Sequence, residues 1–195
     1  MASRQQQAQL TRKKILDAAL ELFNENGFDE VRVSDITEKS NTSKGAFYTH
    51  FNSKYEIFLE KFKEIDEFYL AFEQEHAAST SPILFLERLH IAQARYLRDE
   101  LGKDTVRTIY MNLLRPSEQN FVSDPGRPYF QIVKRQIGKG QQAATFRTDL
   151  SADALSSQWA KAIRGNVYDW CAHDNFDIEE ELKLLMEILL SGIKA

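Results

Sequence analysis

The sequence predicts an all-α fold of about nine helices, and three observations support this. Only four prolines and eight glycines occur in 195 residues. Runs of β-branched residues are nearly absent. Apolar residues instead recur at intervals of three and four, the spacing that places them on one face of a helix. With 43% hydrophobic and 28% charged residues, the composition is that of an ordinary globular protein with one substantial core or two small ones.

The first helical signal lies near the start of the chain. Its apolar stripe consists of Ile15, Ala18, Ala19, Leu22 and Phe23. Thr11 is the expected N-cap of this helix, and Gly27 stands where a left-handed C-cap residue is needed. A second, shorter helix is expected around Ile36, with Ser34 as its cap.

The third helical signal is short, small and basic. After turn residues 41–43, the next five residues can form roughly two turns of helix. Exposed amides at the start of this helix and the charge of Lys44 suit phosphate oxygens, while Gly45 and Ala46 are small enough to approach base edges. The residues expected to point inward are Phe47 and Phe51, and those expected to point outward are Tyr48, Thr49 and His50. Three helices in this order form a helix-turn-helix unit, which predicts DNA binding.

Residues 11–58 as a whole resemble the N-terminal domain of the TetR family of bacterial transcriptional regulators. The resemblance rests on Ile-Leu-x-Ala-Ala-x-x-Leu-Phe, Asn-Gly-Phe, Ile36, Ser-Lys-Gly-x-x-Tyr and His-Phe-x-Ser-Lys. Thr37 stands where the family often has alanine, and Thr49 where a second aromatic residue commonly follows Tyr48. Both departures can alter phosphate contacts or operator preference. The resemblance implies DNA contacts, mostly to phosphates, by Ser34, Thr42, Ser43, Lys44, Tyr48, Thr49, His50 and Lys54, and the small size of Gly45 adds it to the expected interface.

The distribution of charge agrees with a DNA-binding N-terminal part. The whole chain carries −4. Residues 1–54 hold eight Lys and Arg against seven Asp and Glu, or +1, which leaves −5 on residues 55–195. Four basic residues, Arg4, Arg12, Lys13 and Lys14, precede the first acid, Asp17. Because phosphates respond to charge within a Debye length of about 8 Å, the local distribution matters more than the total.

We therefore expect a helix-turn-helix domain over residues 1–54 and a helical effector-binding and dimerisation domain over residues 55–195. A long helix from Ser53 to His76 would connect them. Further helices are expected from Pro82 to Tyr96, from Thr105 to Leu114 and from Tyr129 to Gly140, with a loop over 117–128 and a connector over 145–150.

Two final helices have the clearest patterns of the second half. One stripe consists of Leu155, Trp159, Ile163, Val167 and Trp170 after a Ser151 cap, and the other of Ile178, Leu182, Leu185, Leu189 and Ile193 after an Asp177 cap. The resemblance implies that these helices pair with those of a second copy. One recognition unit also binds too few base pairs for useful specificity, which favours a homodimer. The alternative is that both stripes are buried within one chain.

The middle helices are rich in aromatic residues, which usually form a core. The resemblance implies that such a bundle often encloses a cavity for a small effector. The expected lining is Phe62, Phe72, Tyr96, Tyr110, Phe130, Trp159, Ile163 and Asn166, with Asn112 and Arg164 as further polar candidates. No spacing selects among these residues, and the effector itself is unknown.

Enzymatic and membrane roles find little support. The histidines lie in no metal-binding spacing, Cys171 has no second thiol, and no cofactor is expected. No apolar stretch reaches the roughly 20 residues of a membrane span, and no signal-peptide core follows Met1. The single cysteine fits a reducing compartment, so a cytoplasmic location is expected. We expect a repressor released from a palindromic operator by its effector. Two alternatives remain: a DNA-binding protein of the same fold controlled by a protein partner or by its DNA site, and a helical enzyme or sensor without DNA binding.

Overall fold

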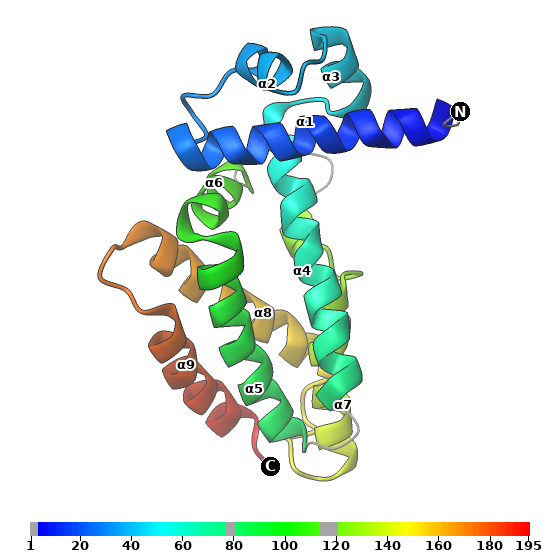
Figure 1. Cartoon of the computed structure of the whole chain (residues 1–195). Helices are drawn as coiled ribbons and strands as arrows, with labels where there is room; N and C mark the ends of the chain where they lie inside the picture. Colours follow the sequence, from blue (N-terminus) through cyan, green and yellow to red (C-terminus); the bar gives the residue numbers. More distant parts are fainter. Residues whose placement is uncertain (1–3, 77–80, 114–120) are drawn as a thin grey trace. The chain divides into compact units, whose positions relative to one another are not determined.

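The computed structural model describes residues 4–76, 81–113 and 121–195, and these residues are almost entirely helical (Figure 1). The helices are α1 (Arg4–Asn26), α2 (Val33–Lys39), α3 (Lys44–His50), α4 (Lys54–His76), α5 (Pro82–Arg95), the π-helical segment η1 (Tyr96–Leu101), α6 (Lys103–Leu113), the 3-10 turn η2 (Phe121–Ser123), α7 (Pro128–Gln142), α8 (Ala152–Ala172) and α9 (Ile178–Ile193). Within the described ranges no β-strand occurs, and only Phe146 and Lys194 form an isolated β-bridge. The all-α prediction is confirmed.

The chain divides into two compact units, Met1–Phe62 and Lys63–Ala195. The division falls inside α4, whereas the expected boundary between residues 54 and 55 coincides with the first turn of that helix. The domain limits therefore stay a prediction. Of the loop expected over 117–128, residues 117–120 lie outside the described residues, and η2 begins immediately after them.

Local capping chemistry was predictable in several places. Gly27 follows α1 with φ of 80°, the left-handed conformation that glycine adopts without steric cost. Ser151 Oγ accepts from the Ala154 amide at the start of α8. Asp177 Oδ1 accepts from two amides at the start of α9, at 2.9 and 3.2 Å. Each of these caps satisfies backbone groups that the helix cannot pair internally.

Two expected caps were wrong. Helix α1 begins at Arg4 rather than at Thr11, because the good helix formers upstream extend it. The Thr11 hydroxyl donates to the Gln7 carbonyl one turn back, which satisfies a threonine inside a helix. Helix α2 begins at Val33 with Arg32 as its N-cap, so Ser34 lies inside it. The Arg32 amide donates to Asp35 Oδ2 at 2.8 Å, so the side chain that caps the start of α2 is that of Asp35 and not that of Ser34.

The core of the first unit forms where α1, α2 and α3 pack on one another. Its fully buried side chains are Ile15, Ala19, Ile36, Phe47, Phe51 and Ile57. Phe47 and Phe51 point inward, as the sequence predicted, and their rings lie 5.9 Å apart. A helix of seven residues is not stable alone. Burial of Phe47 and Phe51 in the core therefore stabilises α3.

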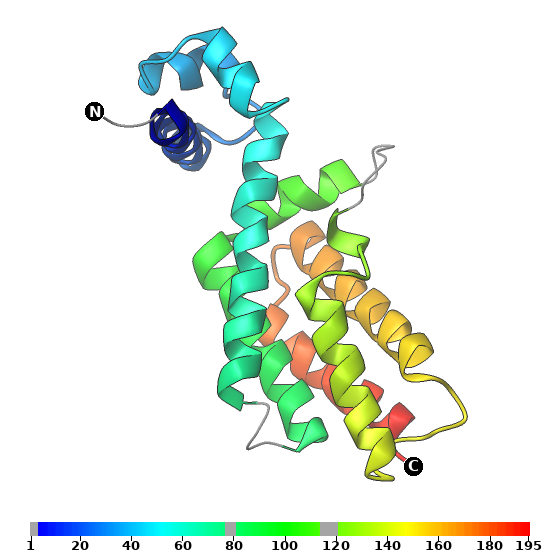
Figure 2. The same cartoon turned by 90° about the vertical axis from the view of Figure 1, so that its right-hand side faces the viewer.

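The second unit is a helical bundle in which α5 packs on α7 and α9, and α8 packs on α6, α7 and α9 (Figure 2). A polar cluster lies at its centre. His90 is fully buried, its Nδ1 donates to the Leu86 carbonyl at 2.6 Å, and its Nε2 accepts from Trp159 Nε1 at 3.1 Å. Indole nitrogen only donates and a carbonyl only accepts, so these partners fix one neutral tautomer, and the Tyr129 hydroxyl 3.0 Å from Nε2 must also donate. Burial lowers the pKa of His90 to about 4.

A close backbone approach ties α7 to the segment that follows it. A Cβ atom at Gly140 would lie 2.0 Å from the buried ring of Phe146, so only glycine fits there. Gly138 in the same helix has no such neighbour.

Candidate nucleic-acid interface and ligand pocket

The turn between α2 and α3 is fixed by its own polar side chains. Asn41 adopts a left-handed conformation with φ of 51°, which asparagine tolerates better than most residues. The Thr42 amide donates to the Thr37 carbonyl at 2.9 Å, and the hydroxyls of Thr42 and Ser40 lie 2.8 Å apart. Ser43 then caps α3 by accepting from the Ala46 amide at 3.0 Å. These bonds set the direction in which α3 leaves the turn.

Opposite the buried aromatics, α3 presents a small, basic and polar face. Lys44, Gly45 and Thr49 are exposed, and Tyr48 is 56% exposed although its neighbour Phe47 is fully buried. His50 is half-buried. A side chain added at Gly45 would make only an ordinary contact, 3.7 Å from Ser43 Oγ. The fold of the chain therefore does not require glycine at this position.

The hydroxyl groups expected to contact DNA differ in whether their hydrogen is already donated within the chain. Ser43 uses only an oxygen lone pair as a cap, so its hydrogen can be donated to a phosphate. Thr49 donates to the Gly45 carbonyl at 2.8 Å. The Ser34 hydroxyl lies 3.3 Å from Asp35 Oδ1, and Thr42 is tied to Ser40. Phosphate oxygens only accept, so Thr49 and Ser34 would have to exchange an internal hydrogen bond to reach them.

Lys54, another expected DNA contact, is hydrogen-bonded within the chain. Its Nζ donates to the backbone carbonyls of Phe28 at 2.6 Å and Val31 at 2.9 Å, and it lies 3.3 Å from that of Asp29. The same ammonium group lies 4.3 Å from the centroid of the Phe28 ring. An ammonium group has three hydrogens to donate, and the loop after α1 uses them. Lys54 therefore stabilises that loop in the chain without DNA, and its expected DNA contact stays a prediction.

Two other basic residues of this unit are also neutralised internally. Arg12 lies 2.7 Å from Glu60 and 4.9 Å above the ring of Phe51. Lys39 lies 3.0 Å from Glu21. The four early basic residues thus do not act as one group, since Arg12 belongs to the packing of α1 against the start of α4.

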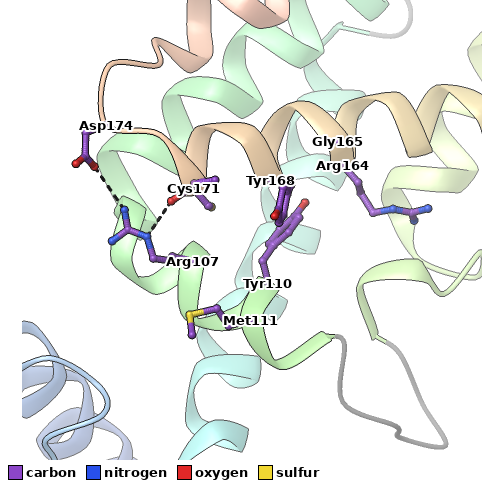
Figure 3. Close-up of a pocket in the computed structure, with 9 residues that line it drawn as sticks. Arg107, Tyr110, Met111, Arg164, Gly165, Tyr168, Cys171 and Asp174 are labelled. Carbon is purple, nitrogen blue, oxygen red and sulfur yellow. Dashed lines mark hydrogen bonds and ion pairs between the residues drawn. The ribbon is translucent and has the colours of Figure 1, made fainter.

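The second unit contains a pocket of about 850 Å³ between α6 and α8 (Figure 3). Its lining consists of Arg107, Tyr110, Met111, Arg164, Gly165, Tyr168, Cys171, Ala172 and Asp174. Tyr110 and Tyr168 point toward one another across it. Arg107 donates to the Cys171 carbonyl at 2.8 Å and pairs with Asp104 and Asp174, so its charge is already compensated. Burial raises the pKa of Cys171 to about 11, which leaves the thiol neutral and unreactive.

A smaller pocket of about 480 Å³ lies against α7 and α8 and shares Arg164 with the first. The Arg164 guanidinium lies 5.8 Å from the centroid of the Phe130 ring, which also lines this second pocket. Arg164 therefore reaches from one pocket to the other.

The expected effector-pocket residues are spread over several environments. Tyr110 lines the larger pocket and Phe130 the smaller one. Trp159 and Ile163 are buried core residues, and Asn166 is half-buried with an Oδ1 that has no hydrogen-bond partner. Phe72 stacks on His76 with ring centroids 4.2 Å apart, and Tyr96 stacks on Phe68 at 4.7 Å. The side chains of Phe62 and Asn112 lie outside the described residues.

Sequence reasoning missed most of the lining, namely Arg107, Met111, Gly165, Tyr168, Cys171, Ala172 and Asp174. Apart from buried Cys171, these residues are exposed or half-buried on α6 and α8 or, in the case of Asp174, lie just beyond the end of α8, so an apolar-periodicity search gives no signal for them. Arg164, a sequence candidate, does line both pockets.

The last two helices bury their sequence-predicted stripes unequally. The stripe of α8, from Leu155 to Trp170, is buried within the chain. Helix α9 buries Leu182, Met186 and Leu190 but leaves Leu184 and Ile188 exposed at 52% and 60%. Helix α9 therefore has a second apolar side that the expected stripe does not include, and pairing of the last two helices with a second copy stays a prediction.

Among the described residues, no group of three or more His, Cys, Asp and Glu side chains is arranged to hold a metal ion. No helix in the described ranges combines the length and apolar character needed to cross a membrane.

Comparison with known proteins identifies the N-terminal unit. Residues 15–60 match the family model described as "Bacterial regulatory proteins, tetR family". The fatty acid metabolism regulator protein of Bacillus subtilis is 23% identical over 92% of this chain and 94% of its own length. The HTH-type transcriptional regulator AcrR of Shigella flexneri is 24% identical, covering 95% of this chain and 90% of its own.

The fold has relatives among solved structures. The Thermus thermophilus TetR-family repressor FadR, solved with lauroyl-CoA, is 22% identical, covers 93% of this chain and 94% of its own, and superposes with a TM-score of 0.74. The helix-turn-helix unit, the matching family model and the full-length relatives agree. Residues 15–60 therefore form a DNA-binding domain of the TetR-family type, and the whole chain shares its fold with TetR-family regulators.

Proposed function

We propose that the protein is a ligand-responsive transcriptional repressor that binds a two-fold symmetric operator as a homodimer in the cytoplasm. The observation that carries DNA binding is the exposed face of α3, where Lys44, Gly45 and Tyr48 stand outward on a helix anchored by buried Phe47 and Phe51. Lys44, Ser43 and Tyr48 would donate to phosphates, and Gly45 would allow α3 to approach base edges.

The proposed dimer contact is the outer side of α9. Leu184 and Ile188 are one turn apart and largely exposed, and Leu185 and Leu189 beside them are half-buried. Two such helices from two copies would bury this surface together. Light scattering after chromatography tests the contact: Leu184→Glu with Ile188→Glu should give a monomer, whereas an unchanged dimer would place the interface elsewhere.

We further propose that the effector enters through the pocket between α6 and α8. The pocket combines tyrosine rings, the Met111 side chain and the guanidinium of Arg164, so it suits an elongated apolar molecule with a polar or anionic end. Because the Thermus relative was solved with lauroyl-CoA, that compound is the first probe. Gly165→Leu is the proposed block, since Gly165 lines the pocket and a Cβ atom added there would meet no atom of the chain within 4 Å.

Helix α4 is the proposed route from effector to DNA. In the second unit it is held by two bidentate ion pairs two turns apart, Asp66 with Arg127 and Glu73 with Arg135. Between them, the Tyr69 ring lies 5.2 Å from that of Tyr129. Arg127 is close enough to Tyr69 and Tyr110 to oppose the rise in pKa that burial causes in both. A ligand beside Tyr110 can therefore disturb the attachment of α4, which continues into the first unit.

The test is fluorescence anisotropy with a duplex selected from a random library. Wild-type protein should bind it, lauroyl-CoA or another effector from a metabolite screen should release it, and Gly165→Leu should bind DNA but resist release. Light scattering of the variant checks that its dimer is intact. Binding that no small molecule reverses would favour the other candidate, control by a protein partner.

A further inference from the structure

The first turns of α1 form a part of the first unit that the helix-turn-helix does not use. Residues 4–10 are exposed on every side of the helix, and the first buried side chain is Ile15. In Figure 1, α1 extends past α3 toward the N-terminus. Arg12 marks the crossing, because its guanidinium lies over Phe51, the residue that ends α3. Eight residues from Arg4 to Thr11 therefore project about 12 Å beyond the packed unit.

The helical repeat determines which side chains of this projecting segment lie on the same side of α1 as the buried residues. Arg4, Thr11, Ile15 and Leu22 are separated by seven, four and seven residues, so they share one side of α1. Ile15 packs toward α2 and α3 on that side. Arg4 therefore points in the direction of α2 and α3 but lies beyond them. Lys13 is two residues from Ile15, about 200° around the helix, and points away.

The distance of α1 from the DNA can be estimated by comparing the depth of the major groove with the diameter of a helix. The major groove is about 8.5 Å deep, and a helix with its side chains is about 10–12 Å across. When α3 fills the groove, the helix on which it rests lies near the level of the phosphates at the groove edge. Helix α1 packs directly against α3, so the projecting part of α1 would lie beside that phosphate ridge.

Charge favours DNA over other occupants of this surface. No acidic residue occurs before Asp17. Arg12 is paired with Glu60, so Arg4 and Lys14 are the basic residues left toward this side. A second copy of the same segment would be repelled, and the only large apolar side chain there is Leu10. We infer that Arg4–Lys14 of α1 is a second DNA contact, which binds the phosphate backbone beside the groove that α3 occupies; this rests on the proposed function.

Two duplexes test the inference, both built from a sequence selected with wild-type protein. The long duplex carries about eight extra base pairs on each side, and the short one ends at the selected site. A projection of about 12 Å corresponds to three to four base pairs at 3.4 Å each, so a contact made beyond the base pairs that α3 reads is available only on the long duplex. The variants are Arg4→Gln and, as a matched loss of charge on the opposite side, Lys13→Gln.

On the long duplex, Arg4→Gln should lower the slope of log K against log salt by about 0.9 per chain, or roughly 1.8 per dimer, and weaken binding. On the short duplex it should match wild type, and Lys13→Gln should match wild type on both. Equal effects of the two variants, or an Arg4→Gln effect that is the same on both duplexes, would overturn the inference. If wild-type protein bound no duplex at all, the proposed function would fail first.

Discussion

Replacing Gly45 by alanine separates what α3 needs for folding from what it needs for DNA. Gly45 is the second residue of α3 and does not adopt positive φ. An added methyl group would lie 3.7 Å from Ser43 Oγ and would meet nothing else within 4 Å. The chain therefore accepts alanine without strain, and any loss of function must arise outside the chain.

The two expected effects have opposite signs. Alanine is favoured over glycine in a helix by about 0.5–1 kcal/mol, so the variant should be more stable. In a chain of this size that corresponds to a rise in Tm of roughly 1–4 °C. At the DNA the same methyl group would stand between α3 and the base edges. Loss of one base-edge contact costs about 1–3 kcal/mol, which is a roughly 5- to 150-fold weaker complex.

Circular dichroism melting and fluorescence anisotropy at one fixed salt concentration measure both quantities. Gly138→Ala is the matched control, because it adds a methyl group to α7 where nothing lies within 4 Å. It should raise Tm and leave DNA affinity unchanged. Gly140→Ala should instead lose about 1–3 kcal/mol of stability, because its Cβ would overlap the Phe146 ring.

The reasoning would be refuted by a Gly45→Ala variant that binds the selected duplex as tightly as wild type. Such a result would mean that α3 does not come close to the bases, and that its exposed face contacts phosphates alone. A loss of stability in the same variant would mean that the surroundings of Gly45 differ from those described.

Three further predictions follow from charges. Lys44→Ala should lower the salt slope by about 0.9 per chain on selected and random duplexes alike; a change in sequence preference with an unaltered slope would remove Lys44 from the phosphates. The folded-state pKa of His90, about 4, lies below its unfolded value near 6.5, so stability should be full above pH 6.5 and fall by about 2 kcal/mol between pH 7 and pH 5. Urea titrations should show this slope in wild type and not in His90→Gln. Asp66→Asn should cost more stability than Glu73→Gln in the same titrations, because it removes a carboxylate that pairs with buried Arg127, whereas the arginine partner of Glu73 is exposed and that pair should contribute less than about 1 kcal/mol; equal costs would contradict the assignment.

Much of the fold was predictable because the deciding interactions are local. Helix periodicity and caps such as Ser151 and Asp177 involve residues within one or two turns, and the inward direction of Phe47 and Phe51 follows from their spacing. The start of α1 was not predictable from a cap, because the described helix begins in a run of good helix formers rather than at a capping residue.

The parts of the candidate sites that could not be predicted from the sequence are those where residues far apart in the chain come into contact. Lys54 lies beside carbonyls 23 to 26 residues away, and no sequence pattern marks that contact. The lining of the larger pocket combines charged, aromatic and small residues of α6 and α8 with Asp174 beyond the end of α8, and this mixture has no apolar periodicity. The exposed apolar side of α9 depends on how that helix packs, because Leu182 and Leu190 are buried in the chain whereas Leu184 and Ile188 are not.

The most direct test of the central claim is selection of bound sequences from a random duplex library by the wild-type dimer. The account predicts enrichment of one palindromic site whose half-sites lie about one helical turn, or a multiple of it, apart, with two chains bound per site or a multiple of two. Recovery of unenriched sequences, or of a site without two-fold symmetry, would contradict it.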